Sequence, residues 1–182
     1  MVPSSYLKIA RDAIKARLDG VQINQNSFLS TDTDLLCKKA TFITLTLHGQ
    51  LRGCIGSLIP HRNLLDDLIA NAESAAFNDP RFTPLTAEEL DAVKIEVSLL
   101  SEPKKVIYTD RNELKSLIHI GRDGVILRLG SYQATFLPQV WEELPDFDTF
   151  FTHLGMKAGV GSDPLSYHPE IYTYQVDKIK ES

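Results

Sequence analysis

Residues 41–60 read "TFITLTLHGQLRGCIGSLIP" and contain two runs of strand-forming residues. A turn around residues 48–50 separates the runs, and Pro60 ends the second one. Gly53 and Gly56 interrupt this second run, which also carries an arginine and a cysteine. The segment therefore predicts a β-hairpin whose second strand is unusual.

The segment after the hairpin predicts a helix. In "NLLDDLIANAESAAF", Asn63 is a candidate N-cap, and Asp66 and Asp67 suit the first turn of a helix. Apolar residues recur at helical spacing, namely Leu64, Leu65, Leu68, Ile69, Ala72, Ala75 and Ala76. We expect this helix to pack directly against the hairpin.

A short helix and a strand come next. Thr86 and Glu89 fit a capping box, and residues 93–100 alternate apolar and polar side chains as a half-buried strand does. At the N-terminus, residues 7–18 have apolar positions three and four apart and predict another amphipathic helix. Residues 21–40 are polar and broken, so we expect a loop there.

The order hairpin, helix, strand recurs in the second half of the chain. The corresponding segments are a hairpin over 124–138 around Gly130, a helix over 148–159 with Asp148 as N-cap, and a strand over 171–179. We expect an α+β fold in which two related ββαβ units form one antiparallel or mixed sheet. The first helix and residues 112–120 are flanking additions, and a cleft is expected between the halves.

Composition limits the class of protein. The chain has 182 residues and a formal net charge of -5, which disfavours a broad nucleic-acid surface and leaves room for a local basic patch. No segment approaches the roughly 20 apolar residues of a membrane span, and no secretory signal is visible. Cys37 and Cys54 lack CxxC spacing. We expect reduced thiols, a cytoplasmic protein and no membrane association.

The second strand of the hairpin contains the first candidate site. Strand alternation places Arg52, Cys54 and Gly56 on one face, which we expect to be exposed. Gly53 and Gly56 indicate a bulge, or close approach of a ligand or another backbone. Cys54 beside an arginine is either a candidate catalytic nucleophile or a small buried apolar residue. Its thiol has no histidine next to it in the sequence.

The motif "NDPRF" provides the second candidate site. Asp79 and Arg81 flank a proline, so their ion pair could hold the turn. Alternatively, Arg81 could lie beside Arg52 and offer a second guanidinium to a carboxylate or phosphate ligand. The two interpretations are compatible. The five histidines show no metal-ligand spacing, so we expect no metal site.

Four segments together carry a family resemblance. They are "LRGCIG", "NDPRFTPLTAEEL", "VSLLSEP" and "ATFLPQVWEELPDFDTFFTHLGMKAG". The chain resembles the AMMECR domain family, whose prokaryotic members are called AmmeMemoRadiSam system protein A. The resemblance runs from the first helix to the last strand and implies one AMMECR-type domain over 1–182. It also implies an α+β fold of two unequal subdomains with a cavity between them.

The resemblance implies little about chemistry, because the activity of the family is unsettled. Its motif positions here are Arg52, Gly53, Cys54 and Gly56, followed by Asp79, Arg81 and Phe82. The family name reflects an association with MEMO-type and radical SAM proteins, which implies such partners. No cofactor is indicated.

Three functions follow as hypotheses. The first is an enzyme or enzyme component that binds an anionic small molecule or nucleotide-like ligand at Arg52 and Arg81, with Cys54 as nucleophile. The second is a non-catalytic binding module or adaptor in a modification complex. The third is RNA binding, which the acidic balance disfavours.

Overall fold

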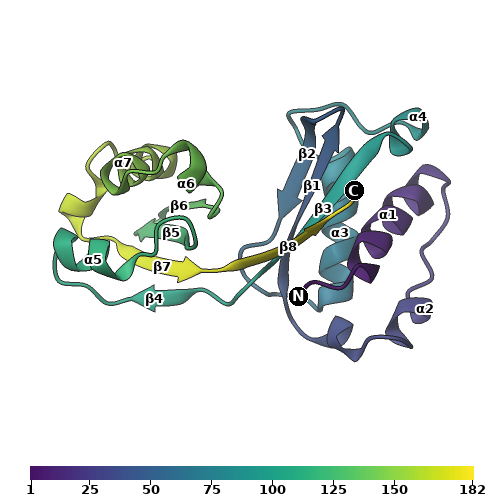
Figure 1. Ribbon diagram of the computed structural model, residues 1–182, viewed down its shortest axis with the longest axis horizontal. Coiled ribbons are helices and arrows are strands. Elements are labelled where there is room, and N and C mark those ends of the chain that lie inside the picture. Colours follow the sequence, from purple (N-terminus) through teal and green to yellow (C-terminus); the bar gives the residue numbers. More distant parts are fainter. The chain divides into compact units, whose positions relative to one another are not determined.

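The computed structural model describes residues 1–182 and divides into two compact units (Figure 1). Unit 1 contains Met1–Glu102 and Asp177–Ser182, and unit 2 contains Pro103–Val176. Each unit has its own apolar core of buried side chains. The chain therefore enters unit 2 once and returns to unit 1 for its last residues.

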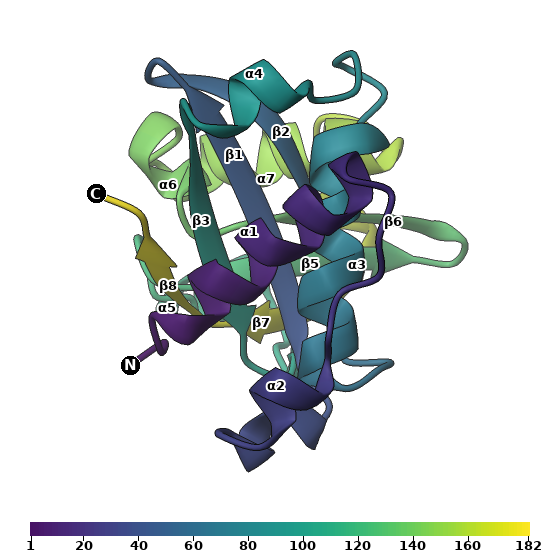
Figure 2. The same ribbon diagram turned by 90° about the vertical axis from the view of Figure 1, so that its right-hand side faces the viewer.

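Unit 1 is a four-stranded sheet with two long helices on one face. Its elements are α1 (Ser5–Leu18), α2 (Asn26–Leu29), the 3-10 helix η1 (Thr33–Leu36), β1 (Ala40–Leu47), β2 (Gln50–Gly56), α3 (Leu64–Phe77), α4 (Ala87–Leu90), β3 (Val93–Leu100) and β8 (Val176–Lys180). The strands lie in the order β2-β1-β3-β8. Figure 2 shows α1 and α3 side by side over the sheet. The core of unit 1 lies between these helices and the sheet.

The predicted hairpin is present as β1 and β2. Its turn has left-handed backbone angles at His48 (φ 52°) and Gly49 (φ 80°), which match the twist of two antiparallel strands. Thr46 pairs with Leu51 while Leu45 pairs with Gly53, so Arg52 is an extra residue. The predicted bulge therefore lies at Arg52.

Unit 2 has the same order of hairpin, helix and strand as unit 1 and forms a separate sheet. Its elements are β4 (Lys104–Val106), α5 (Arg111–Leu117), β5 (Gly124–Leu129), β6 (Tyr132–Phe136), α6 (Val140–Glu143), α7 (Phe147–Ala158), the 3-10 helix η2 (Pro164–Tyr167) and β7 (Glu170–Tyr174). The strands lie in the order β4-β7-β5-β6. Helix α7 packs against the β5–β6 hairpin. The aromatic core includes Trp141 stacked on Phe150 with ring centroids 3.6 Å apart.

One predicted helix start is wrong. The N-cap of α7 is Asp146, whose side chain accepts a hydrogen bond from the Thr149 N–H, and Asp148 lies inside the first turn. The reason is that Phe147 is buried and begins the helix. An N-cap at Asp148 would leave this core residue outside the helix.

The α+β class and the two ββαβ units are confirmed, and the single joined sheet is not observed. Each ββαβ repeat is completed to a four-stranded sheet by the strand that follows the other repeat in the chain. The strand that follows β3 in the chain is β4, and it pairs with β7 in the second sheet. The strand that follows β7 is β8, and it lies beside β3 in the first sheet. The two units thus exchange their fourth strands.

Candidate binding site

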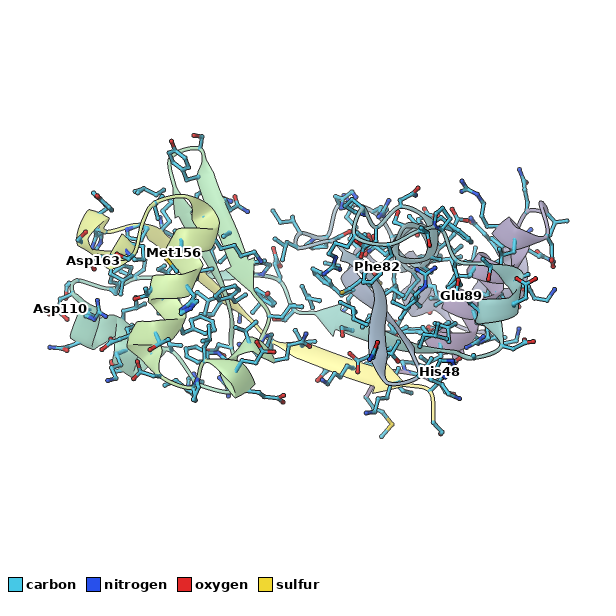
Figure 3. The ribbon with its side chains drawn as sticks, turned by 90° about the horizontal axis from the view of Figure 1, so that it is seen from above. His48, Phe82, Glu89, Asp110, Met156 and Asp163 are labelled. Carbon is cyan, nitrogen blue, oxygen red and sulfur yellow. The ribbon has the colours of Figure 1, made fainter.

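Arg52 lies in the bulge of β2 and its side chain is buried, with 9% of the residue exposed. Its Nε donates to Glu89 Oε2 at 2.7 Å and its Nη2 donates to Glu89 Oε1 at 3.0 Å. Glu89, which is labelled in Figure 3, is held in place by the capping box that it forms with Thr86, the N-cap residue of α4. The expectation that Arg52 shares an exposed face with Cys54 is wrong, because the bulge breaks the alternation of side chains.

One nitrogen of Arg52 stays without a partner. Its Nη1 is buried and makes no hydrogen bond, and it is the one buried side-chain nitrogen or oxygen in residues 1–182 with this property. Buried polar atoms of native proteins are nearly always paired, so this donor requires an explanation.

The Arg52 guanidinium also lowers the pKa of Glu89 to about 2 by hydrogen bonding.

Asp79 holds the turn of the "NDPRF" motif. Its carboxylate accepts the N–H of Cys54 at 3.0 Å and the N–H of Arg81 at 3.1 Å. It also accepts two bonds from the Arg81 guanidinium, at 3.0 Å and 2.7 Å. These donors hold the pKa of the buried Asp79 carboxyl far below its usual range, with the Arg81 hydrogen bond the largest cause. The predicted ion pair across this turn is present.

The same pair covers one edge of the first sheet. Strand β2 is an edge strand, and the N–H of Cys54 that faces away from β1 is bound by Asp79. The Arg81 Nη2 lies 3.5 Å from the Cys54 carbonyl oxygen. Side chains from the loop after α3 thereby satisfy main-chain groups that an edge strand otherwise exposes.

Phe82 connects the two arginines. The guanidinium carbons of Arg52 and Arg81 lie 5.9 Å and 5.4 Å from the centroid of its ring. The two cations therefore lie close to one another, as the second interpretation of the motif predicts. Each guanidinium already forms two bonds to a carboxylate through Nε and Nη2, however, so only its Nη1 is left for a ligand.

Cys54 is half-buried on the other face of β2, opposite Thr44. Its sulfur lies 3.4 Å from the Thr44 hydroxyl, and no histidine is hydrogen-bonded to it. A thiol nucleophile is normally activated by an adjacent base. The hydrogen-bond partner of the Cys54 sulfur is the Thr44 hydroxyl, which is not a base of that kind.

The two glycines of the signature have contacts within unit 1. A Cβ at Gly53 would lie 2.1 Å from the carbonyl oxygen of Ala75 in α3, and one at Gly56 would lie 2.2 Å from the Phe42 ring. The expected close approach of another backbone is thus observed at Gly53. These contacts account for both glycines without a ligand.

Sequence reasoning missed the role of Glu89 as the partner of Arg52. The capping box predicted the position of Glu89 in the first turn of α4 but did not indicate its ion pair with Arg52. Residues 1–182 contain no group of three or more His, Cys, Asp or Glu side chains that could hold a metal ion. None of their helices combines the length and apolar character that crossing a membrane requires.

Comparison with known proteins identifies the family. The AMMECR1 family model matches residues 7–179. A protein of Methanothermobacter thermautotrophicus is 40% identical over 182 residues, covering 97% of this chain and 93% of that protein. A protein of Methanosarcina acetivorans is 36% identical over 178 residues, covering 96% and 89%. The crystal structure of an uncharacterized protein from Pyrococcus horikoshii superposes with a TM-score of 0.88 at 31% identity, covering 98% and 91%. This chain belongs to the AMMECR1 family.

Proposed function

We propose that unit 1 is a non-catalytic binding module that holds a small ligand through a hydrogen-bond acceptor, such as a carboxylate, at Arg52 and Arg81. The observation that carries the proposal is the buried Arg52 Nη1, which has no acceptor within the protein. A bound oxygen atom would satisfy this donor and remove the cost of leaving it unpaired.

The charges around the site narrow the class of ligand. Arg52 is paired with Glu89 and Arg81 with Asp79, so the four groups together carry no net charge. A ligand with several negative charges would therefore gain little net attraction here. A single carboxylate or a carbonyl oxygen fits better than a polyphosphate, since it needs one or two donors and little compensating charge.

Binding is better supported than thiol catalysis. The Cys54 sulfur faces Thr44 on the opposite side of β2 from the packed Arg52, and no base contacts it. The association in the family name supports MEMO-type and radical SAM proteins as partners of such a module. Within the proposal, the module would present a ligand or a partner segment to a modification complex of that kind.

A comparison of arginine variants tests the proposal. Arg52→Lys keeps the positive charge near Glu89 but removes Nη1. The matched control is Arg17→Lys, because Arg17 also pairs with a carboxylate, on Glu73, and lies 5.8 Å from the centroid of a phenylalanine ring, that of Phe77. The probes are acetate, succinate and an N-acetylated amino acid, and calorimetric titration gives their affinities.

We expect the wild type and Arg17→Lys to bind at least one probe equally well, and Arg52→Lys to bind it about tenfold more weakly. Cys54→Ser should keep full affinity. Equal affinities of Arg52→Lys and the wild type would overturn the proposal, as would the absence of carboxylate binding by the wild type. Loss of binding in Cys54→Ser alone would favour the thiol enzyme instead.

A further inference from the structure

A second candidate site lies on the face of the first sheet that α1 and α3 do not cover. A cavity of about 530 Å³ occurs there, lined by Thr44, Thr46, Gly49, Lys94, Ile95, Glu96, Lys180, Glu181 and Ser182. Ligand pockets commonly have volumes of roughly 300–1,000 Å³. None of the residues of the Arg52 site lines this cavity.

Strand alternation explains which side chains of β1 line the cavity. Ile43 and Leu45 of β1 belong to the core, so Thr44 and Thr46 point to the opposite face. In the register of the sheet, Thr46 pairs with Lys94 and Thr44 pairs with Glu96. The cavity floor is thus a patch of hydroxyl, ammonium and carboxylate groups on neighbouring strands.

The last strand adds further positive charge. Ile179 of β8 packs against the core of unit 1, so Lys178 and Lys180 point to the same face as the cavity. Lys94, Lys178 and Lys180 are exposed and form no ion pair within residues 1–182. Three ammonium groups therefore gather on one face of a chain whose formal net charge is -5.

The two glutamates of the cavity differ in their availability. Glu181 accepts bonds from the Arg11 Nε at 2.8 Å and Nη2 at 2.7 Å, and from the N–H of Ile95 at 3.0 Å. Arg11 therefore balances most of its charge, and Lys94 interacts with it more weakly. Glu96 has no such partner, so its carboxylate is free to accept a hydrogen bond from a ligand.

From these groups we infer that the cavity binds a small phosphate-bearing molecule that also carries a hydroxyl or amino group. Ammonium groups bind phosphate as compact point charges, and threonine hydroxyls can donate to its oxygens. Glu96 would accept a bond from the hydroxyl or amino group. The same carboxylate repels a continuous phosphate backbone, which favours a small molecule over RNA.

Titration of the full chain with inorganic phosphate and with glycerol phosphate tests this inference. The test variant is the double substitution Lys94→Gln and Lys180→Gln. The control is Lys38→Gln and Lys39→Gln, which removes the same charge from two other exposed lysines of unit 1. Calorimetry or phosphorus NMR measures both affinities at low salt.

We expect the wild type and the control to bind glycerol phosphate more tightly than phosphate, and the test variant to lose at least tenfold in both affinities. Equal losses in the two double variants would overturn the inference, because bulk charge would explain them. Tighter binding of a single-stranded RNA oligonucleotide than of glycerol phosphate would overturn it as well. Phosphate binding that Arg52→Lys weakens and the test variant does not would also overturn the inference, because it would assign the phosphate to the Arg52 site.

Discussion

Gly53 illustrates how one missing side chain allows α3 to pack on β2. A Cβ there would overlap the carbonyl oxygen of Ala75, a main-chain atom that cannot move without moving the helix. We expect Gly53→Ala to lower the free energy of unfolding by about 3 kcal/mol, measured by urea denaturation.

Gly20 provides the matched control for this substitution. It has a left-handed backbone (φ 69°) but open space around its Cα, so Gly20→Ala should cost only about 1 kcal/mol. If Gly53→Ala is no more destabilising than Gly20→Ala, the helix and strand pack less closely at this point than described.

The sequence predicted the unusual residues of β2 but not the direction of their side chains. Glycine spacing correctly indicated a bulge and a close approach. Simple alternation then failed at Arg52, because the bulge adds one residue and turns its side chain into the protein. The sequence of one strand does not show where such an extra residue lies, because a bulge is defined by the pairing with the partner strand.

Among the secondary-structure elements, α4 carries Glu89, which takes part in the capping box of this helix and also binds Arg52 of the candidate site. Glu89 has a pKa of about 2 in the folded protein, against an ordinary value of 4.5, because it is bound to Arg52. The lowered pKa means that this bond contributes its full stability above pH 4.5 and loses it as the pH falls towards 2. Asp79, whose pKa is also lowered, contributes in the same direction.

Glu89→Gln should therefore weaken the decrease in unfolding free energy between neutral and acid pH. Urea denaturation at a series of pH values measures this dependence. Glu88→Gln is the control, since Glu88 is exposed on the same helix and forms no ion pair. Identical pH profiles for Glu89→Gln and the wild type would show that the Arg52–Glu89 pair does not contribute to the pH dependence of the unfolding free energy.

Long periodic elements followed from the sequence, and so did the short helix α4 through its capping box, whereas the short helices without such a signal did not. The helix α3 starts after Asn63, as predicted, but Asp67 in its first turn is fully buried. Asp67 accepts bonds from the Thr41 main chain and hydroxyl, Ser57, Arg62 and Asn71. The predicted loop over 21–40 contains the short helices α2 and η1. Three- and four-residue elements have too few positions to show a period.

Across the whole chain, the repeated order of elements predicted two similar units but not the exchange of their fourth strands. Unit 1 has the order β2-β1-β3-β8, and unit 2 has the equivalent order β6-β5-β7-β4. The strand β4 is only three residues long, and β8 continues directly from the segment of β7. Local sequence patterns do not state which sheet a strand joins, because pairing depends on distant residues.

We expect residues 103–176 to fold alone, because this continuous segment contains a complete sheet and its own core. Unit 1 should also fold when Glu102 is joined to Asp177 by a short glycine-rich linker. Circular dichroism and dispersed amide NMR spectra would verify both folds. A disordered spectrum from either piece would show that its sheet requires the rest of the chain.

The exchange of β4 and β8 has a consequence for limited proteolysis. A protease that cuts only between β3 and β4 leaves β8 hydrogen-bonded within the first sheet while its sequence is still continuous with unit 2. The two fragments would then elute together from a sizing column under native conditions and separate only in denaturant. Release of unit 2 requires a second cut, between β7 and β8.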